Sequence, residues 1–237
     1  MNMLKILNLN AGYGKLQVLY NISAEFKDKN ITVIIGPNGS GKSTLLKAIM
    51  NMVNIYSGNI MYYGNDITSM APYKRVREGL AYLPQVGNVF TNLTVQENLR
   101  IASYSLDKKE KKPKMEEALG FFPVLSRYID KKASKLSGGE RQMVAMGMAL
   151  IKNAKVMLLD EPCGSLSPKL SYEVINNIVR LNEELEMTIV MVEQVVKQAL
   201  TVGDEAYLLV AGRIKFKGEA DELLNNPELG KLYLGVK

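Results

Sequence analysis

The stretch ITVIIGPNGSGKST, Ile31 to Thr44, decides the fold class of this chain. Its opening run ITVIIG, Ile31–Gly36, is short and β-branched, which predicts a buried strand of a parallel sheet. The helical pattern KSTLLKAIMNM begins at Lys42, directly after the glycine-rich segment. A glycine-rich loop between a buried strand and a helix is the context of a phosphate-binding P-loop.

The loop itself supplies the groups that nucleotide phosphates need. Glycines let backbone N–H groups surround the phosphates, and the N-terminus of the next helix adds a favourable dipole. We expect Lys42 to neutralise the β- and γ-phosphates and the Ser43 hydroxyl to bind Mg²⁺. The alternative is an ordinary glycine-rich turn. The residues predicted to contact ATP here are Gly36, Pro37, Asn38, Gly39, Ser40, Gly41, Lys42, Ser43 and Thr44.

A second buried strand, KVMLLDEP at Lys155–Pro162, ends in two carboxylates. In nucleotide hydrolases such a strand lies beside the P-loop strand. Asp160 is then expected to hold Mg²⁺ through water, and Glu161 to polarise the attacking water as the catalytic base. Adjacent carboxylates at a strand end are common, so the prediction depends on the P-loop.

A second candidate anion site lies in KLSGGERQ, Lys135–Gln142. Ser137, Gly138 and Gly139 stand at the start of a predicted helix, where free N–H groups favour an anion. An ordinary N-cap turn would explain the serine alone. It would not explain the full string between a P-loop and a strand that ends in Asp-Glu.

The order of elements indicates an α/β core that a helical region interrupts. Strands and helices, among them a helix over Ser171–Glu186, alternate in the first and last parts, which implies a mostly parallel sheet. LKILNLNAGYG and VLYNISAEF near the start alternate like an antiparallel pair. From Val86 to Leu150 helix signals dominate, including a capping box at Thr94 and Glu97. We therefore predict a nucleotide-binding α/β core with an antiparallel β part over residues 1–85 and 151–237, and a helical subdomain over residues 86–150.

The composition of the chain indicates the cellular compartment in which we expect the protein. The chain has 237 residues, a formal net charge of +6 and a single cysteine, Cys163. One cysteine allows no internal disulfide and fits a reducing cytosol, and we expect it to serve in packing. No signal-peptide core precedes the first strand, and no apolar run approaches the ~18–20 residues that span a bilayer. We expect a cytosolic protein whose link to any membrane passes through a partner.

The P-loop, LSGGERQ and LLDEP, in this order, resemble those of ABC-type ATPases, the nucleotide-binding subunits of ABC transporters. The resemblance implies a P-loop NTPase (RecA-like) fold, with ATP and Mg²⁺ as cofactors. It implies that Tyr13 stacks on adenine, and that Gln85 senses Mg²⁺ and the γ-phosphate.

The resemblance also implies partners. Two ATPase subunits would pair head to tail, so that Ser137, Gly138 and Gly139 serve the other subunit's ATP. The helical subdomain would grip two transmembrane permease subunits at the cytoplasmic face of the membrane. An extracytoplasmic solute-binding protein would take part indirectly, and no nucleic acid partner is expected.

Most ABC ATPases have histidine at the position of Gln194, yet this chain has no histidine at all. A glutamine amide can still donate a hydrogen bond to a γ-phosphate oxygen, so we include Gln194 with Lys42 and Glu161 in the catalytic set. The VEQ sequence resembles the LivF-like ATPases of branched-chain amino acid uptake. These resemblances favour an importer ATPase in a heterodimer.

The chain departs from that branch at several positions, so the resemblance does not determine which solute is transported. The branch commonly has glutamate at the position of Gln85 and arginine at that of Met148, and the acidic position after LLDEP is Ser167 here. The alternatives are an importer for urea, an amide or another amino acid, a non-transport ABC ATPase, and a module that senses ATP without hydrolysing it.

Overall fold

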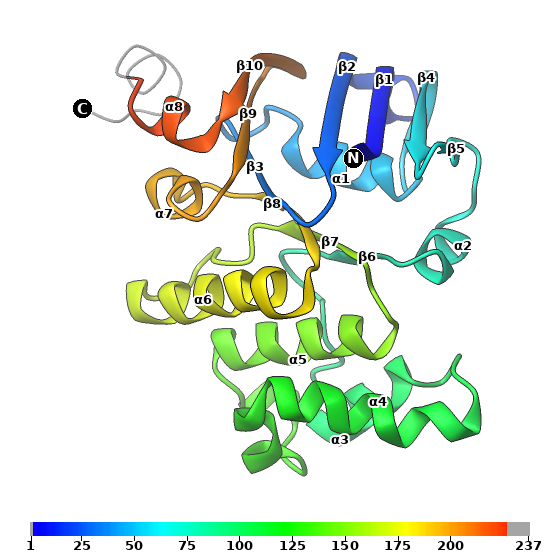
Figure 1. The fold of residues 1–237 in the computed structure, drawn as a ribbon, viewed down its shortest axis with the longest axis vertical. Coiled ribbons are helices and arrows are strands. Elements are labelled where there is room, and N and C mark those ends of the chain that lie inside the picture. The colour runs from blue at the N-terminus through cyan, green and yellow to red at the C-terminus, as the bar shows by residue number, and fades with distance from the viewer. Residues whose placement is uncertain (1, 227–237) are drawn as a thin grey trace.

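The computed structural model describes residues 2–226. The carboxyl-terminal LYLG, Leu232–Gly235, which also resembles the LivF-like branch, lies outside these residues. Within them, six strands form a mixed sheet in the order β10-β9-β3-β8-β7-β6 (Figure 1). The parallel strands are β3 (Ile31–Ile35), β6 (Leu80–Leu83), β7 (Val156–Asp160), β8 (Thr188–Val192) and β9 (Glu205–Val210), and β10 (Arg213–Glu219) runs antiparallel to β9. Strand β8 pairs with both β3 and β7, so the expectation that the strand ending in Asp160 lies directly beside the P-loop strand is wrong.

A second sheet is antiparallel, with the order β2-β1-β4-β5. Its strands are β1 (Asn2–Tyr13), β2 (Leu16–Lys27), β4 (Asn54–Tyr62) and β5 (Asn65–Asp66). The predicted pairing of the first two strands is confirmed, with Leu9 opposite Ile22 in the register.

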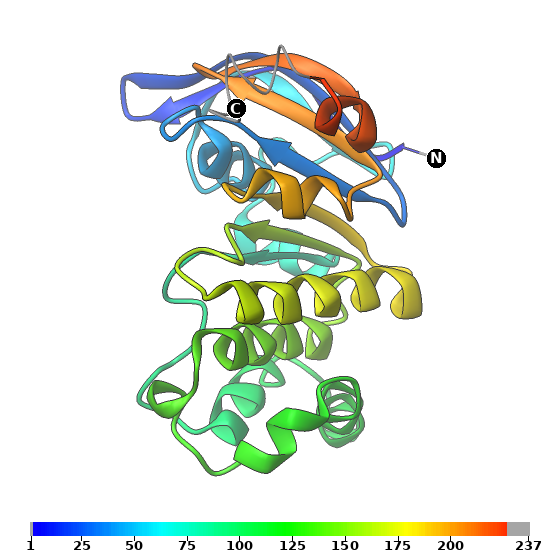
Figure 2. The same cartoon turned by 90° about the vertical axis from the view of Figure 1, so that its left-hand side faces the viewer.

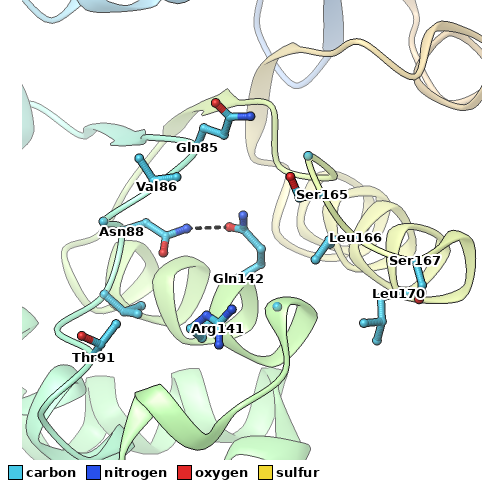
Figure 3. A pocket seen from close by; sticks show the side chains of 14 residues that line it. Gln85, Val86, Asn88, Thr91, Arg141, Gln142, Ser165, Leu166, Ser167 and Leu170 are labelled. Atoms are coloured by element: carbon cyan, nitrogen blue, oxygen red, sulfur yellow. Dashed lines mark hydrogen bonds between the residues drawn. The ribbon is translucent and has the colours of Figure 1, made fainter.

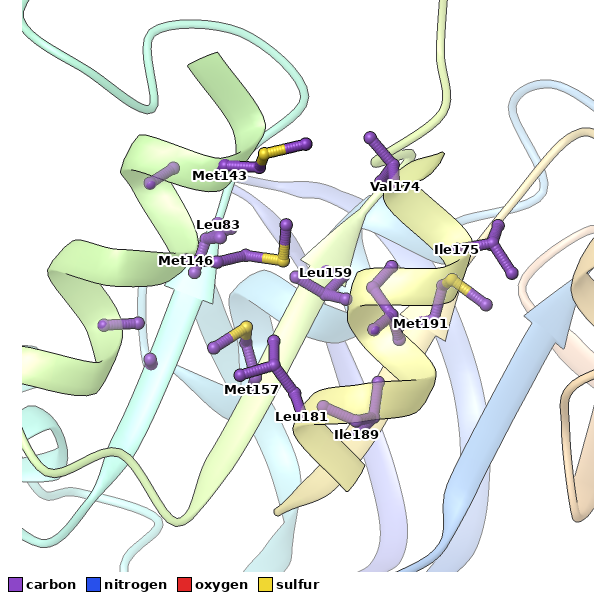
Figure 4. Packing of buried hydrophobic residues seen from close by; sticks show 14 of the residues in the cluster. Leu83, Met143, Met146, Met157, Leu159, Val174, Ile175, Leu181, Ile189 and Met191 are labelled. Atoms are coloured by element: carbon purple, nitrogen blue, oxygen red, sulfur yellow. The ribbon is translucent and has the colours of Figure 1, made fainter. Parts of the chain in front are cut away.

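Both faces of the mixed sheet are buried, because alternate side chains of its strands enter two different apolar clusters. On one face α1 (Lys42–Ile49) lies between the two sheets. On the other face lie α5 (Gly138–Ile151), α6 (Pro168–Leu185), α7 (Val196–Leu200) and α8 (Ala220–Leu224). Figure 4 shows side chains of α5 and α6 packed against β7 and β8, among them Met146, Val174, Leu159 and Met191.

The helical region lies at the opposite end of the molecule from the antiparallel sheet (Figures 1 and 2). It contains α3 (Val95–Ala102), α4 (Lys108–Phe121) and two 3-10 helices, Pro123–Tyr128 and Ala133–Lys135. The predicted capping box is confirmed, because Thr94 and Glu97 exchange both hydrogen bonds at the start of α3. Within residues 2–226 we find no helix long and apolar enough to cross a bilayer.

Helix α6 corrects a predicted boundary. The sequence predicted a helix over Ser171–Glu186, whereas α6 starts at Pro168 and ends at Leu185. Ser167 caps it by accepting a hydrogen bond from Leu170 N, and proline is well suited to the first helical position.

A buried arginine of α2 (Pro72–Arg77) forms hydrogen bonds with the end of α1. The Arg75 side chain is fully buried, and its guanidinium donates hydrogen bonds to four backbone carbonyls. Burial lowers the pKa of Arg75 to about 10. The carbonyl acceptors, at the end of α1 and in the loop before α2, belong to Ile49, Ile67, Thr68 and Met70.

Candidate nucleotide-binding site

The predicted P-loop encloses a hollow of about 260 Å³ at the N-terminus of α1. Gly41 caps that helix with a left-handed φ of 101°, which an L side chain rarely adopts. A Cβ on Gly36 would lie 2.0 Å from Leu209 O, so the loop can start only with glycine. The lining residues are Val18, Asn38, Gly39, Ser40, Gly41, Lys42, Ser43, Thr44 and Glu161.

Two polar side chains of the loop are buried and suited to an anion. Lys42 is 5% exposed, and its Nζ donates to Gly36 O at 2.8 Å and to Pro37 O at 3.1 Å. Burial lowers the pKa of Lys42, and nearby carboxylates led by Glu161 oppose that shift. Ser40 is 3% exposed, and its Oγ has no hydrogen-bond partner within residues 2–226. A phosphate oxygen in the hollow would satisfy both groups.

The two residues predicted to hold the metal are in contact. Ser43 Oγ donates to Asp160 Oδ1 at 2.8 Å, so the start of α1 meets the carboxyl end of β7. In the described part of the chain no group of three or more acidic, cysteine or histidine side chains could hold a metal ion. Mg²⁺ commonly uses one or two carboxylates together with phosphate oxygens and water. A hydroxyl beside one carboxylate is consistent with this mode of Mg²⁺ binding.

Glu161 follows Asp160 and stands at the edge of the hollow. Its backbone has a left-handed φ of 49°, and its N–H donates to Val192 O at 3.0 Å. Two amides share its Oε2 atom, because Gln85 Nε2 donates at 2.8 Å and Gln194 Nε2 at 2.7 Å. The structure therefore brings together three predicted site residues from the ends of β6, β7 and β8.

Glu193 supports this arrangement from within the core. It is 1% exposed, and it accepts hydrogen bonds from Cys163 N at 2.8 Å and Gln194 N at 3.1 Å. Burial raises the pKa of Glu193, while these hydrogen bonds act in the opposite direction. Burial, together with Glu193, raises the pKa of the Cys163 thiol, and the cysteine is a packing residue as predicted.

The predicted second anion site lies apart from the P-loop. Ser137 is the exposed N-cap of α5 and forms a capping box with Glu140. Gly138 packs so closely on Leu166 that a Cβ there would lie 2.3 Å from its side chain. Gly138 borders a different hollow, of about 370 Å³, which shares no lining residue with the P-loop hollow.

This larger hollow lies between the loop after β6, the start of α5 and the segment before α6 (Figure 3). Asn88 Nδ2 donates to Gln142 Oε1 at 2.8 Å across it, which joins the loop after Gln85 to α5. Gln85 and Gly164 also border this hollow, and Gln85 donates a hydrogen bond to Glu161, which lines the P-loop hollow.

Tyr13 is a predicted residue that the structure does not bring into the P-loop hollow. It ends β1, is 44% exposed, and does not line the hollow. Two adjoining residues were missed as members of the site. Glu193 directly follows an apolar strand, a visible signal, whereas the contact between Tyr82 and Asp160 gave no signal in the sequence.

Comparison with known proteins agrees with this geometry. The family model described as ABC transporter matches residues 19–164. A relative from Archaeoglobus fulgidus, a probable branched-chain amino acid transport ATP-binding protein LivF, is 49% identical and covers 99% of each chain. The high-affinity branched-chain amino acid transport ATP-binding protein BraG of Pseudomonas aeruginosa is 37% identical over 98% of this chain and 100% of its own.

A solved structure shares the fold. It is the dimeric post-hydrolysis state of the ATP-binding cassette MJ0796 bound to ADP and Pi, with a TM-score of 0.78 and 25% identity over 92% of this chain and 99% of that one. The sequence match and the shared fold lead to one conclusion: the chain belongs to the ABC transporter family, as one of its ATP-binding cassettes.

Proposed function

We propose that this chain is the ATP-hydrolysing subunit of an importer for branched-chain amino acids. The observation that carries hydrolysis is the placement of Glu161, whose carboxylate borders the P-loop hollow and accepts two neutral amide hydrogen bonds. A carboxylate at this position can polarise a water that attacks the γ-phosphate. The solute assignment is supported by the printed names of the two relatives, which share 49% and 37% identity with the chain.

In this proposal, Lys42 and the backbone N–H groups of the loop hold the phosphates. Lys42 would exchange its two carbonyl partners for phosphate oxygens. Ser43, Asp160 and Gln85 would hold Mg²⁺, with Asp160 acting through water. When bound, Mg²⁺ neutralises charge that develops on the phosphates. Tyr13 would stack on adenine.

Gln194 and Glu161 would act in the hydrolytic step. Glu161 holds the water, and the Gln194 amide donates to a γ-phosphate oxygen through the second N–H of its NH₂ group, the first being bonded to Glu161. The separate position of Gly138 supports the use of Ser137, Gly138 and Gly139 on a partner's ATP. The dimeric state of the MJ0796 cassette with ADP and Pi supports such a pair. We propose a head-to-tail dimer with a second, different ATPase subunit.

Two permease subunits would bind this pair at the cytoplasmic face of the membrane, where the chain is peripheral. An extracytoplasmic solute-binding protein would deliver the solute. Residues 86–150 would form the permease-gripping subdomain, and residues 1–85 and 151–237 the nucleotide-binding core. The exposed side chains of Val86 and Phe90, just after Gln85, support a contact surface there.

The test is transport by the complex co-purified with its permease and partner ATPase and reconstituted in liposomes with its binding protein. We expect ATP-dependent leucine uptake. Glu161→Gln should bind ATP like wild type and hydrolyse it more than about 100-fold more slowly. Glu173→Gln, at an exposed position of α6, is the matched control and should hydrolyse ATP normally.

Each part of the proposal can fail separately. Hydrolysis by Glu161→Gln at the wild-type rate would show that Glu161 is not the base. Uptake of urea in place of leucine would support the alternative importer. Co-purification with ribosomes or DNA, without permeases, would overturn the transport role.

A further inference from the structure

A partly buried tyrosine, Tyr82, contacts the carboxylate that the proposed function assigns to Mg²⁺. The Tyr82 hydroxyl donates to Asp160 Oδ2 at 2.8 Å. The other oxygen, Oδ1, accepts from Ser43 at 2.8 Å. Both oxygens of Asp160 thus accept hydroxyl hydrogen bonds, and the plane of the carboxylate is fixed between α1 and β6.

The sheet register explains how the two residues meet. β6 and β7 are parallel neighbours, and Tyr82 stands opposite Leu158. Asp160 lies two residues further along β7, about 6.6 Å away along the strand and on the same face. The tyrosine side chain covers that distance, whereas a serine or threonine at position 82 would fall short of the carboxylate.

The hydroxyl is a hydrogen-bond donor at neutral pH, because a phenol ordinarily titrates at a pH of about 10. Tyr82 also stands three residues before Gln85, so β6 and the loop that follows it carry one contact to Asp160 and one contact to Glu161.

We propose that Tyr82 is a positioning residue for the metal, which orients Asp160 so that Oδ1 stays directed at Ser43. The proposal rests on the proposed function, in which Ser43 and Asp160 hold Mg²⁺. Groups that hydrogen-bond to a metal-binding carboxylate typically change metal affinity or activity 10–100-fold when they are lost. The Tyr82 hydroxyl is such a group.

The test removes that one oxygen atom. Mn²⁺ serves as the probe, its binding to the purified full-length chain followed by electron paramagnetic resonance with a non-hydrolysable ATP analogue present. We expect Tyr82→Phe to weaken Mn²⁺ binding roughly tenfold. Affinity for the analogue in EDTA should stay within about twofold of wild type, because that binding uses the P-loop and not Asp160.

Tyr207→Phe is the matched control. Tyr207 is 1% exposed, and its hydroxyl pairs with the backbone of Glu25 at 2.9 and 3.0 Å, away from the site. It should bind Mn²⁺ like wild type. An equal loss of Mn²⁺ affinity in both variants would overturn the proposal, since lost packing would then explain it. Unchanged Mn²⁺ affinity in Tyr82→Phe would also overturn it.

A double substitution adds a readout that a packing role would not produce. If Tyr82 acts through Asp160, then Tyr82→Phe should have no further effect on Mn²⁺ affinity in an Asp160→Asn background. Additive losses would contradict the proposal. If wild type bound Mn²⁺ no better with the ATP analogue than without it, that result would instead refute the proposed function.

Discussion

Gln194 Nε2 lies 2.7 Å from Glu161 Oε2 and donates a hydrogen bond to it. Gln85 Nε2 donates to the same oxygen at 2.8 Å. Both donors are uncharged amides, so they orient the carboxylate without adding a positive charge or a titratable proton. In a chain without histidine, the position that most ABC ATPases give to histidine retains a donor but loses a group that could shift protons.

This relationship predicts different outcomes for two substitutions at position 194. Gln194→Ala should lower kcat by about 100-fold or more, because loss of one preorganised donor typically lowers kcat by roughly 10²–10³. Gln194→His should bind ATP normally and turn over at least as fast as wild type, since imidazole can also donate. Steady-state ATPase assays of the complex give kcat and KM for each.

Gln198→Ala, four residues further along in α7, is the control and should leave both constants unchanged. If Gln194→Ala were as active as wild type, the amide would have no part in turnover. A collapse of activity in Gln194→His would show that the amide has a role that imidazole cannot fill.

A second prediction separates two roles of Ser137, the N-cap of α5 and the proposed contact to a partner's ATP. Thr94 provides a close comparison, because Thr94 with Glu97 and Ser137 with Glu140 form the same capping box. Alanine at either position should destabilise the fold by about 1 kcal/mol. Only Ser137→Ala should also weaken ATP-driven pairing of the ATPase subunits.

The first measurement is the free energy of unfolding of each variant. The second, made in a Glu161→Gln background, is the ATP concentration that drives dimer formation. Equal effects of Ser137→Ala and Thr94→Ala on pairing would mean that the serine only caps its helix.

The elements around the nucleotide site could be predicted because local patterns encode them. β3, β7 and β8 are mostly apolar runs, and their ends carry the P-loop, Asp160 and Gln194. The capping box at Thr94 is equally local. Hydrogen bonds across strands are different, since the bond from Tyr82 to Asp160 depends on the pairing of β6 with β7.

Arg75 shows most clearly what local sequence patterns do not predict. An arginine in a polar segment suggests a solvated side chain, yet Arg75 is fully buried and bonded to four carbonyls. Those acceptors become available only when the end of α1 and the loop before α2 have folded together. No local pattern contains that information.

The last prediction concerns Glu193, whose pKa burial raises above its ordinary value of 4.5. Above pH 4.5 the unfolded chain releases the proton while the folded chain keeps it. Stability contributed by the protonated form is therefore greatest near or below pH 4.5 and falls as the pH rises toward the folded-state pKa. Glu193→Gln does not titrate.

The free energy of unfolding of wild type minus that of Glu193→Gln should thus decrease as the pH rises above 4.5, by at most about 1.4 kcal/mol per pH unit, and then level off. Urea unfolding between about pH 3 and pH 8 measures this difference and that of the control. Glu184→Gln is the control with the opposite sign, because the Arg180 hydrogen bond lowers the pKa of Glu184. The free energy of unfolding of wild type minus that of Glu184→Gln should change only below pH 4.5, and it should fall as the pH falls. A wild-type minus Glu193→Gln difference that is flat or rising above pH 4.5 would show that the hydrogen bonds from Cys163 and Gln194 outweigh burial at Glu193.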